Sequence, residues 1–228
     1  MRIDILTLFP EMFQGFLTES IIKRAIEKEK VEINIIDFRK YSLSKHQQVD
    51  DTPYGGGSGM VLMCEPIVRA IEDLKTSNSL VLLTCPQGIN YQEKVAHDLK
   101  KQKHLIIICG HYEGYDERIR EFVDLEISIG DYILTGGELP AMVITDSVVR
   151  LLDGVIKENS YLEDSFTNNL LDYPVYTKPA NFRGLKVPDV LLSGDHAKID
   201  KYRQKMQVER TRERRPDLIG DKDGRENK

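Results

Sequence analysis

Five short apolar runs alternate with segments of helical periodicity along the first 152 residues of this 228-residue chain. Short apolar runs bounded by turn residues indicate buried strands, and apolar positions that recur every three or four residues indicate helices. Alternation of the two predicts an α/β fold with a parallel sheet. The predicted strands are residues 2–9, 31–38, 80–84, 104–109 and 125–129. The predicted helices are residues 10–29, 66–74, 92–101, 116–122 and 138–152.

Three of the apolar runs end in loops that contain glycine, at residues 84–88, 109–118 and 128–140. Ligands of open α/β sheets bind outside the carboxyl ends of the strands, and glycine lets a backbone approach a ligand closely. In the third loop, flat apolar walls for a group such as adenine are offered by Tyr132, Ile133 and Leu134. For any one loop, a turn that only reverses the chain is the competing interpretation. Because all three loops follow strands, we expect them to form one pocket.

The rest of the chain lacks this regular alternation. Residues 39–63 show no periodicity, and a stretch of that length inside a domain is usually functional or disordered. Polar residues 153–169 indicate a linker, and residues 194–215 indicate a basic helix that is ended by Pro216. The tail, 220–228, is expected to be disordered. The predicted organisation is a first domain at 1–158, an interdomain linker at 159–175 and a small, mainly helical basic domain at 176–228.

Charge is distributed unevenly along the sequence. Residues 1–175 hold 18 Lys and Arg against 28 Asp and Glu, a net charge of −10. Residues 176–228 hold 14 against 9, a net charge of +5. A basic segment on an acidic protein is typical of nucleic-acid binding. A basic helix that only faces solvent is the alternative.

Several classes of protein are disfavoured by the composition. The apolar runs are too short to span a bilayer, and Asp4 interrupts the apolar N-terminus, which therefore does not resemble a signal peptide. The three cysteines are widely spaced and suit neither a disulfide framework nor a zinc site. We expect a cytoplasmic protein with no membrane association.

Several sequence blocks together resemble the bacterial tRNA (guanine-N1)-methyltransferases of the TrmD family. The blocks are FPEMF at 9–13, VDDTPYGGGSGM at 49–60, the loops around Gly110 and Gly130, and EDSF at 163–166. The resemblance runs to about residue 219 and departs only near Asp195-His196 and in the short tail. It implies a SPOUT methyltransferase domain with a deep trefoil knot, a homodimer, and S-adenosylmethionine (AdoMet) as methyl donor. The implied substrate is tRNA, methylated on N1 of the guanosine immediately 3′ of the anticodon, tRNA position 37.

The resemblance also assigns the cofactor pocket residue by residue. The assigned residues are Pro86, Gly88, Gly110, Tyr112, Glu113, Ile129, Gly130, Tyr132, Leu134, Gly136, Gly137 and Pro140. Asp131 and Ile133, in the same loop as Tyr132, complete the predicted set. Glu113 could balance the sulfonium charge or hold the Mg²⁺ that the family uses. The sequence contains no recognisable pattern for a divalent ion, so the metal ligands stay unknown.

Two further residues are implied to carry the chemistry. Guanine N1 holds a proton at neutral pH, and the family's general base corresponds to Asp164. The alternative is that residues 163–166 start a helix, which Asp164 or Ser165 would cap. Arg150 corresponds to the arginine near the target guanine, where it would stabilise negative charge on O6. Its alternative role is to offset the dipole at the end of a helix.

Other residues are predicted to bind the tRNA substrate. Residues 50–59 lack the Gly-Lys-Ser/Thr ending of a phosphate loop, so a loop that helps to hold a flipped guanine is favoured, with Asp50 as a contact. The basic helix would meet tRNA phosphates through Lys198, Lys201, Lys205 and Arg212. Surface or packing roles are expected for the isolated His46, His111 and His196.

Two other functions remain open on the residues alone. A SPOUT enzyme could methylate a ribose 2′-OH, a reaction that needs no base to deprotonate guanine. A non-catalytic RNA-binding module could use AdoMet only as a sensor ligand.

Overall fold

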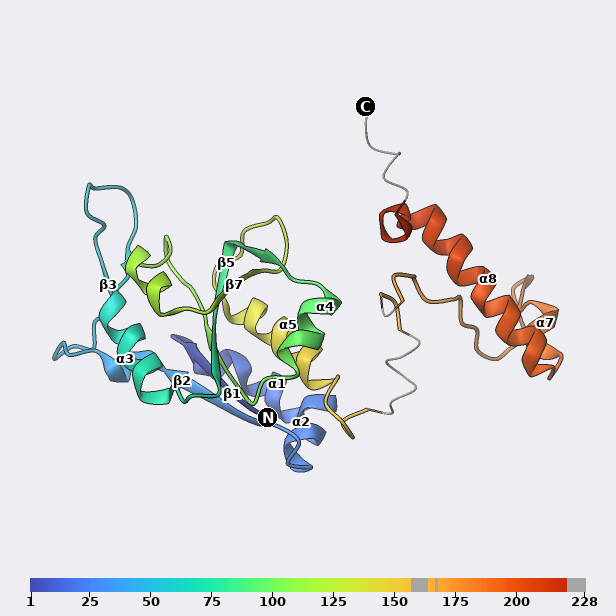
Figure 1. The fold of residues 1–228 in the computed structure, drawn as a ribbon, viewed down its shortest axis with the longest axis horizontal. Helices are drawn as coiled ribbons and strands as arrows, with labels where there is room; N and C mark the ends of the chain where they lie inside the picture. Colours follow the sequence, from blue (N-terminus) through green and yellow to red (C-terminus); the bar gives the residue numbers. More distant parts are fainter. Residues whose placement is uncertain (157–163, 167, 221–228) are drawn as a thin grey trace. The chain divides into compact units, whose positions relative to one another are not determined.

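The computed structural model describes residues 1–156, 164–166 and 168–220 (Figure 1). The chain divides into two compact units, Met1–Ile156 and Lys157–Lys228, and each is described here by itself. The first unit ends two residues before the predicted boundary after residue 158. Residues 159–175 fall within the second unit in this division, so the separate linker stays a prediction.

The first unit is built on a five-stranded parallel sheet, which confirms the predicted α/β class. The strands are β1 (Arg2–Thr7), β2 (Glu32–Asp37), β5 (Ser79–Asn90), β6 (His104–Ile108) and β7 (Leu125–Ser128), in the order β2-β1-β6-β5-β7. The second and third glycine loops follow β6 and β7, and the first glycine segment, residues 84–88, lies within the neighbouring β5. This strand order therefore brings the three loops to one end of the sheet.

Helices cover both faces of the sheet, as a parallel sheet requires. They are α1 (Gln14–Thr18), α2 (Ser20–Glu27), α3 (Cys64–Leu74), α4 (Glu93–Leu99) and α5 (Glu138–Val149), with 3₁₀ helices η1 (Pro10–Phe13), η2 (Phe38–Tyr41) and η3 (Glu117–Phe122). In Figure 1, α3 lies on the opposite side of the sheet from α1, α2 and α5. The helix expected at 116–122 is the 3₁₀ helix η3, with the Asp116 side chain accepting from the Arg118 N–H.

The single helix predicted over residues 10–29 is wrong. The chain forms η1, α1 and α2 in succession, and Glu19 adopts an extended conformation (φ −127°, ψ 160°) between the two α-helices. The Thr18 hydroxyl donates to the carbonyl of Gln14 at 2.9 Å, a side-chain contact that competes with regular helix geometry. The apolar periodicity continues through the break between α1 and α2, so the sequence pattern gave no sign of the break.

The expectation of a patternless stretch at 39–63 also needs correction. Asp50–Asp51 (β3) pairs antiparallel with Val61–Leu62 (β4), and the loop between them extends away from the sheet (Figure 1). We call residues 50–62 the arm. Val49 and Leu62 anchor its base in the core, with 2% and 0% of their surface exposed. The paired strands are two residues long, which is too short for period-two alternation to show in the sequence.

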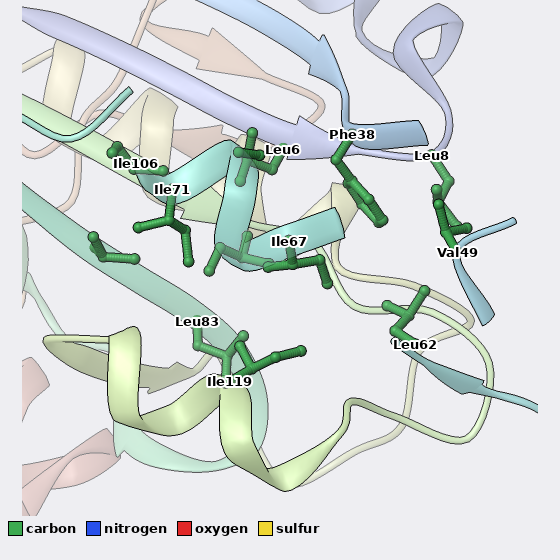
Figure 2. Packing of buried hydrophobic residues seen from close by; sticks show 13 residues of the cluster. Leu6, Leu8, Phe38, Val49, Leu62, Ile67, Ile71, Leu83, Ile106 and Ile119 are labelled. Carbon is green, nitrogen blue, oxygen red and sulfur yellow. The ribbon is translucent and has the colours of Figure 1, made fainter. Parts of the chain in front are cut away.

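A hydrophobic cluster packs between the sheet, α3 and η3. Figure 2 shows Ile67 and Ile71 of α3 between Leu6 of the sheet and Ile119 of η3. Sheet residues two apart share this face because side chains alternate along a strand. The alternate residue Thr7 points to the other face, where its hydroxyl donates to Glu138 of α5 at 2.8 Å.

A buried polar network joins four strands at the end of the sheet where they begin. Asp4 is fully buried and accepts from Arg2 Nη2 at 2.7 Å and from Asn34 Nδ2 at 2.9 Å. His104 Nε2 lies 2.9 Å from the Asp4 carboxylate, and His104 Nδ1 lies 2.6 Å from Ser79 Oγ. The sequence did not indicate this network, because Asn34, Ser79 and His104 lie far from Asp4 along the chain.

Replacing Asp4 with alanine is expected to lower the free energy of unfolding by about 1–3 kcal/mol, since the buried His104 and the partly buried Asn34 lose a hydrogen-bond partner. Denaturant unfolding measures the change. The control is Asp98→Ala, which breaks the exposed Asp98–Lys101 pair (2.7 Å) and is expected to cost less than about 1 kcal/mol. Equal losses for the two variants would contradict a stabilising role for the network.

The second unit contains a two-stranded hairpin and a long helix. Its elements are β8 (Asn181–Phe182), β9 (Leu185–Lys186), α7 (Asp189–Leu192), α8 (His196–Arg214) and η4 (Pro216–Ile219). The predicted basic helix is therefore confirmed as α8, and the Asp195 side chain caps it by accepting from the Lys198 N–H. In the part of the chain that the structure describes, no helix is long and apolar enough to cross a membrane.

Candidate functional site

A cavity of about 540 Å³ lies at the carboxyl ends of β5, β6 and β7. Its lining comes from residues 84–87, 110–120 and 127–140. The last two ranges belong to the loops after β6 and β7, to η3 and to the end of β7, whereas residues 84–87, expected to be a loop after a strand, lie within β5 where its register with β7 shifts. The expected convergence of the three glycine loops is therefore present in the fold. The cavity volume is in the range of small-molecule binding sites.

Of the fourteen residues predicted to bind a cofactor, twelve line this cavity. The other two, Gly88 and Asp131, are not among the lining residues. A side chain on Gly88 would place Cβ 2.3 Å from the Ile127 nitrogen, so glycine there lets β5 pass close to β7. Asp131 is an exposed residue. The ligand-binding roles themselves stay predictions.

The back wall of the cavity consists of closely packed loop backbones. Gly137 N–H donates to the Gly110 carbonyl at 2.8 Å. A Cβ on Gly137 would lie 2.4 Å from Thr84 Oγ1 and 2.5 Å from the Gly110 nitrogen. Only glycine allows the three loops to meet this closely. The loops therefore form one continuous wall.

Two weakly acidic side chains, the Cys109 thiol and the Tyr115 phenol, pack in this wall near the buried carboxylate of Glu138. Burial, reinforced by the nearby Glu138, raises the pKa of the Cys109 thiol well above its usual value. Burial also raises the pKa of the Tyr115 phenol, whose hydroxyl donates to the Thr84 carbonyl at 3.0 Å. Both groups are therefore protonated at neutral pH and act as fixed packing and hydrogen-bonding groups.

The arm is joined to the second loop by main-chain hydrogen bonds. Glu113 N–H donates to Met60 at 3.0 Å, Leu62 N–H to Gly114 at 2.9 Å, and Asp116 N–H to Leu62 at 2.9 Å. Gly59 has φ +83°, and a Cβ there would lie 2.4 Å from Glu113 Cγ. The arm is thus fixed to the cavity wall by main-chain hydrogen bonds and close packing at Gly59. Asp50, at the base of the arm, is half-buried and is not among the lining residues.

Several lining residues were missed in the sequence. His111, expected at the surface or in packing, is on the cavity wall, where its Nδ1 accepts from the Tyr112 N–H at 2.9 Å and its ring lies 4.8 Å from that of Phe9. His111 lies in the 109–118 loop that was expected to help form the pocket, but no role in the pocket was assigned to it; of the residues missed, only Arg120 and Ile127 lie outside the three predicted loops. The other missed residues are Thr84, Cys85, Gln87, Gly114, Tyr115, Glu117, Arg120, Ile127, Ser128 and Thr135.

The two predicted catalytic residues belong to different units. Arg150 follows the last residue of α5 in the first unit, and its N–H donates to the Asp146 carbonyl at 3.0 Å. Asp164 lies in the second unit and is half-buried. The described residues 164–166 and 168–170 form bends and turns, with Phe166 at φ +77°. The alternative that Asp164 or Ser165 caps a helix here is therefore wrong; Glu163 lies outside the described residues.

The predicted phosphate-binding side chains share the exposed side of α8. The opposite side packs on residues 171–173, where Thr211 Oγ1 accepts from the Leu171 N–H at 2.8 Å and Arg203 lies 4.7 Å from the Tyr173 ring. Lys198, Lys201, Lys205 and Arg212 are all exposed. Two of them form surface ion pairs, Lys198 with Asp195 at 2.9 Å and Lys205 with Glu209 at 3.6 Å.

Metal ligands do not cluster in the described part of the chain. Within residues 1–156, 164–166 and 168–220, no group of three or more His, Cys, Asp or Glu side chains is placed to hold a metal ion. Glu113 and Glu117 are the carboxylates on the cavity wall.

Comparisons with known proteins cover nearly the whole chain. The family profile described as "tRNA (Guanine-1)-methyltransferase TrmD" matches residues 1–221. A Bacillus pumilus (strain SAFR-032) protein is 61% identical over 224 residues, which are 96% of this chain and 92% of the relative. A Bacillus subtilis (strain 168) protein is 58% identical, covering 97% and 93%, and a Staphylococcus carnosus (strain TM300) protein is 57% identical, covering 96% and 91%. All three relatives carry the name tRNA (guanine-N(1)-)-methyltransferase.

Proposed function

Because the chain belongs to the tRNA (guanine-1)-methyltransferase TrmD family, we propose that it methylates N1 of the guanosine immediately 3′ of the tRNA anticodon, with AdoMet as methyl donor. The observation that carries the proposal is the glycine-walled cavity at the ends of β5, β6 and β7, lined by twelve of the predicted cofactor residues. The tRNA substrate implies that the reaction takes place in the cytoplasm.

The residues of the cavity fit AdoMet in shape and charge. Gly110, Gly136 and Gly137 let the cavity wall pack closely, because each added Cβ would lie within 2.4 Å of another atom of the protein. Tyr132 and Leu134 would flank the adenine, and Glu113 would face the positive sulfonium. When bound, AdoMet supplies an electrophilic methyl group. The predicted use of Mg²⁺ stays a prediction, with Glu113 and Glu117 as the available carboxylates.

The protein's own residues then have to prepare guanine N1 as a nucleophile. Asp164 would accept the N1 proton, a step that positioned bases accelerate strongly. Arg150 would donate to O6, where negative charge develops as the proton leaves. The target guanine has to leave the base stack before the enzyme can reach it. The arm, with Asp50 at its base, would hold the unstacked guanine beside the cavity wall, to which the arm is hydrogen-bonded.

The whole enzyme is proposed to be a homodimer with a trefoil-knotted first domain. Leu139 and Val143, four residues apart on α5, expose 50% and 45% of their surfaces, which suits a subunit interface. The knot is part of the proposal because membership of the family implies it. Light scattering tests the dimer: a mass near that of one 26.2 kDa chain would contradict it.

Two tRNA transcripts that differ only in G or A immediately 3′ of the anticodon test the reaction. With labelled AdoMet, label is expected in the G transcript alone, in N1-methylguanosine. Equal labelling of both transcripts would indicate ribose 2′-O-methylation and contradict the proposal. AdoMet binding without any transfer would indicate a sensor module instead.

The exposed cations of α8 are expected to contact tRNA phosphates. Replacing Lys201, Lys205 and Arg212 with alanine should lower the magnitude of the slope of log affinity against log salt concentration by roughly two to three units. Each lost phosphate contact lowers this slope by just under one unit. Filter binding at several salt concentrations measures the slope. Alanine at Lys23, Lys28 and Lys101, exposed cations of the first unit, removes the same charge and serves as the control. An unchanged slope in the α8 variant would mean that this helix side faces solvent.

A further inference from the structure

Arg120 forms a network on the cavity wall that no sequence motif indicated. It lies in η3, lines the cavity, and has a side chain that is 23% exposed. Its guanidinium contacts three acceptors: Glu117 Oε1 at 2.9 Å through Nε, Glu126 Oε2 through Nη1, and Gln87 Oε1 at 2.9 Å through Nη2. The network therefore connects η3, β7 and the first cavity loop.

The segment that Arg120 contacts is displaced from the regular sheet. Thr84 and Ile89 of β5 both align with Ile127 of β7, so residues 85–88 form a bulge between two registered positions. The bulge supplies Cys85, Pro86 and Gln87 to the cavity lining. Residues in a bulge lose the ladder pairing that fixes the rest of a strand. The position of this wall therefore depends on other contacts.

Two side-chain contacts hold the bulge, and each is made to one member of the Arg120–Glu126 ion pair. Arg120 donates to Gln87, and the Cys85 thiol donates to Glu126 Oε2 at 3.0 Å. Glu126 is also the carboxylate bound by Arg120. The Arg120–Glu126 pair thus holds the bulge at both its first and its third residue.

We propose that Arg120, paired with Glu126, is a positioning residue that sets the shape of the 85–88 wall and so determines the affinity for AdoMet. The inference rests on the proposed function. Arg120 acts through Gln87 and the bulge, because Nε, Nη1 and Nη2 of its guanidinium each contact a side chain of the protein, and Gln87 is one of these partners. Pairing with two carboxylates also neutralises a cation that would otherwise repel a sulfonium.

Isothermal titration calorimetry with AdoMet tests the proposal on the full chain. Arg120→Ala is expected to weaken AdoMet affinity about tenfold or more, the effect of losing charge-assisted hydrogen bonds. KM for AdoMet should rise accordingly, while kcat at saturating AdoMet stays within about twofold, because the loss concerns binding and not the chemical step. Arg120→Lys should recover only part of the affinity, since one ammonium cannot reproduce the planar set of donors.

The matched control is Arg118→Ala. Arg118 lies on the same 3₁₀ helix and pairs with Asp116 through two donors, but it is 74% exposed and does not line the cavity. Its replacement should leave AdoMet affinity unchanged. Equal losses for the Arg118 and Arg120 variants would overturn the proposal, as would an Arg120→Lys protein with wild-type affinity, because charge alone would then suffice.

A double-mutant cycle with Gln87→Ala separates positioning from general destabilisation. Gln87 is exposed, so its truncation should leave the thermal unfolding temperature nearly unchanged. Gln87→Ala should weaken AdoMet affinity in the wild-type background and have little further effect in Arg120→Ala. Additive losses would overturn the proposed route through Gln87. Failure of the wild-type protein to bind AdoMet would instead contradict the proposed function.

Discussion

Replacing Asp164 with asparagine is expected to slow single-turnover methylation by about a hundredfold or more, the usual contribution of positioned proton transfer. Asparagine keeps the size of the side chain and removes the proton acceptor. AdoMet and tRNA affinities should change little, because the loss is confined to the transition state. Rapid quench with enzyme in excess over labelled tRNA measures the rate, and equilibrium binding measures the affinities.

The pH dependence of the same variant provides a second measurement. The wild-type rate should rise with pH as a carboxylate or the guanine ionises. The Asp164→Asn enzyme should recover part of its deficit at high pH, where guanine N1 loses its proton unaided. The control is Asp189→Asn, an exposed acid in the first turn of α7. A near-normal rate for Asp164→Asn at neutral pH would remove Asp164 from the mechanism and make Glu113 or Asp50 the next residue to test.

Replacing Gly136 with valine is expected to abolish AdoMet binding while the fold is retained. A Cβ at this position would lie 2.3 Å from Glu138 Oε2 and 3.3 Å from His111 Cδ2. Glu138 is only 2% exposed and is held by Thr7, so its carboxylate cannot move aside. The branched side chain must therefore displace the cavity loop, which removes the close backbone approach that the ligand needs. Calorimetry measures the binding, and circular dichroism reports on the fold.

The same substitution at Gly15 is the control. Gly15 lies in α1, and an added Cβ would have no neighbour within 4 Å. Gly15→Val should therefore bind AdoMet like the wild type. Normal AdoMet affinity in the Gly136→Val protein, as measured against this control, would show that the loop around Gly136 does not hold the cofactor.

The elements of the first unit could be predicted where the chain is strongly periodic. The runs at 31–38 and 104–109 became β2 and β6 to within about one residue, and the helix at 66–74 became α3. Buried parallel strands are nearly all apolar and helices are amphipathic, so local composition determines each element. The same reasoning failed at Glu19 and Ser20, where an extended residue followed by one at φ +54° interrupts the helix while the apolar pattern continues.

The glycine loops were predictable for the same local reason. The loops of Gly110 and Gly137 follow β6 and β7 directly, and parallel strands bring their carboxyl ends to one edge of a sheet. The segment at 84–88 was expected to be a loop of the same kind but is a bulge within β5. The Gly110 and Gly137 positions could therefore be assigned to a shared site before the structure was known. Their contact, with Gly137 N–H bonded to the Gly110 carbonyl, follows from strands β6 and β7 lying on either side of β5.

Only the tertiary structure decided which isolated polar residues meet. Asp4 and His104 are 100 positions apart and are brought together by the pairing of β1 with β6. Gln87 and Arg120 meet because β5 bulges beside β7. A single charged residue in a sequence looks the same whether it is solvated or buried in a network, since its partners depend on the strand order. The sequence by itself thus determined the parallel sheet and its glycine loops, whose physical causes act within a few residues. The β2-β1-β6-β5-β7 order, which depends on packing between distant segments, determined the polar networks around them.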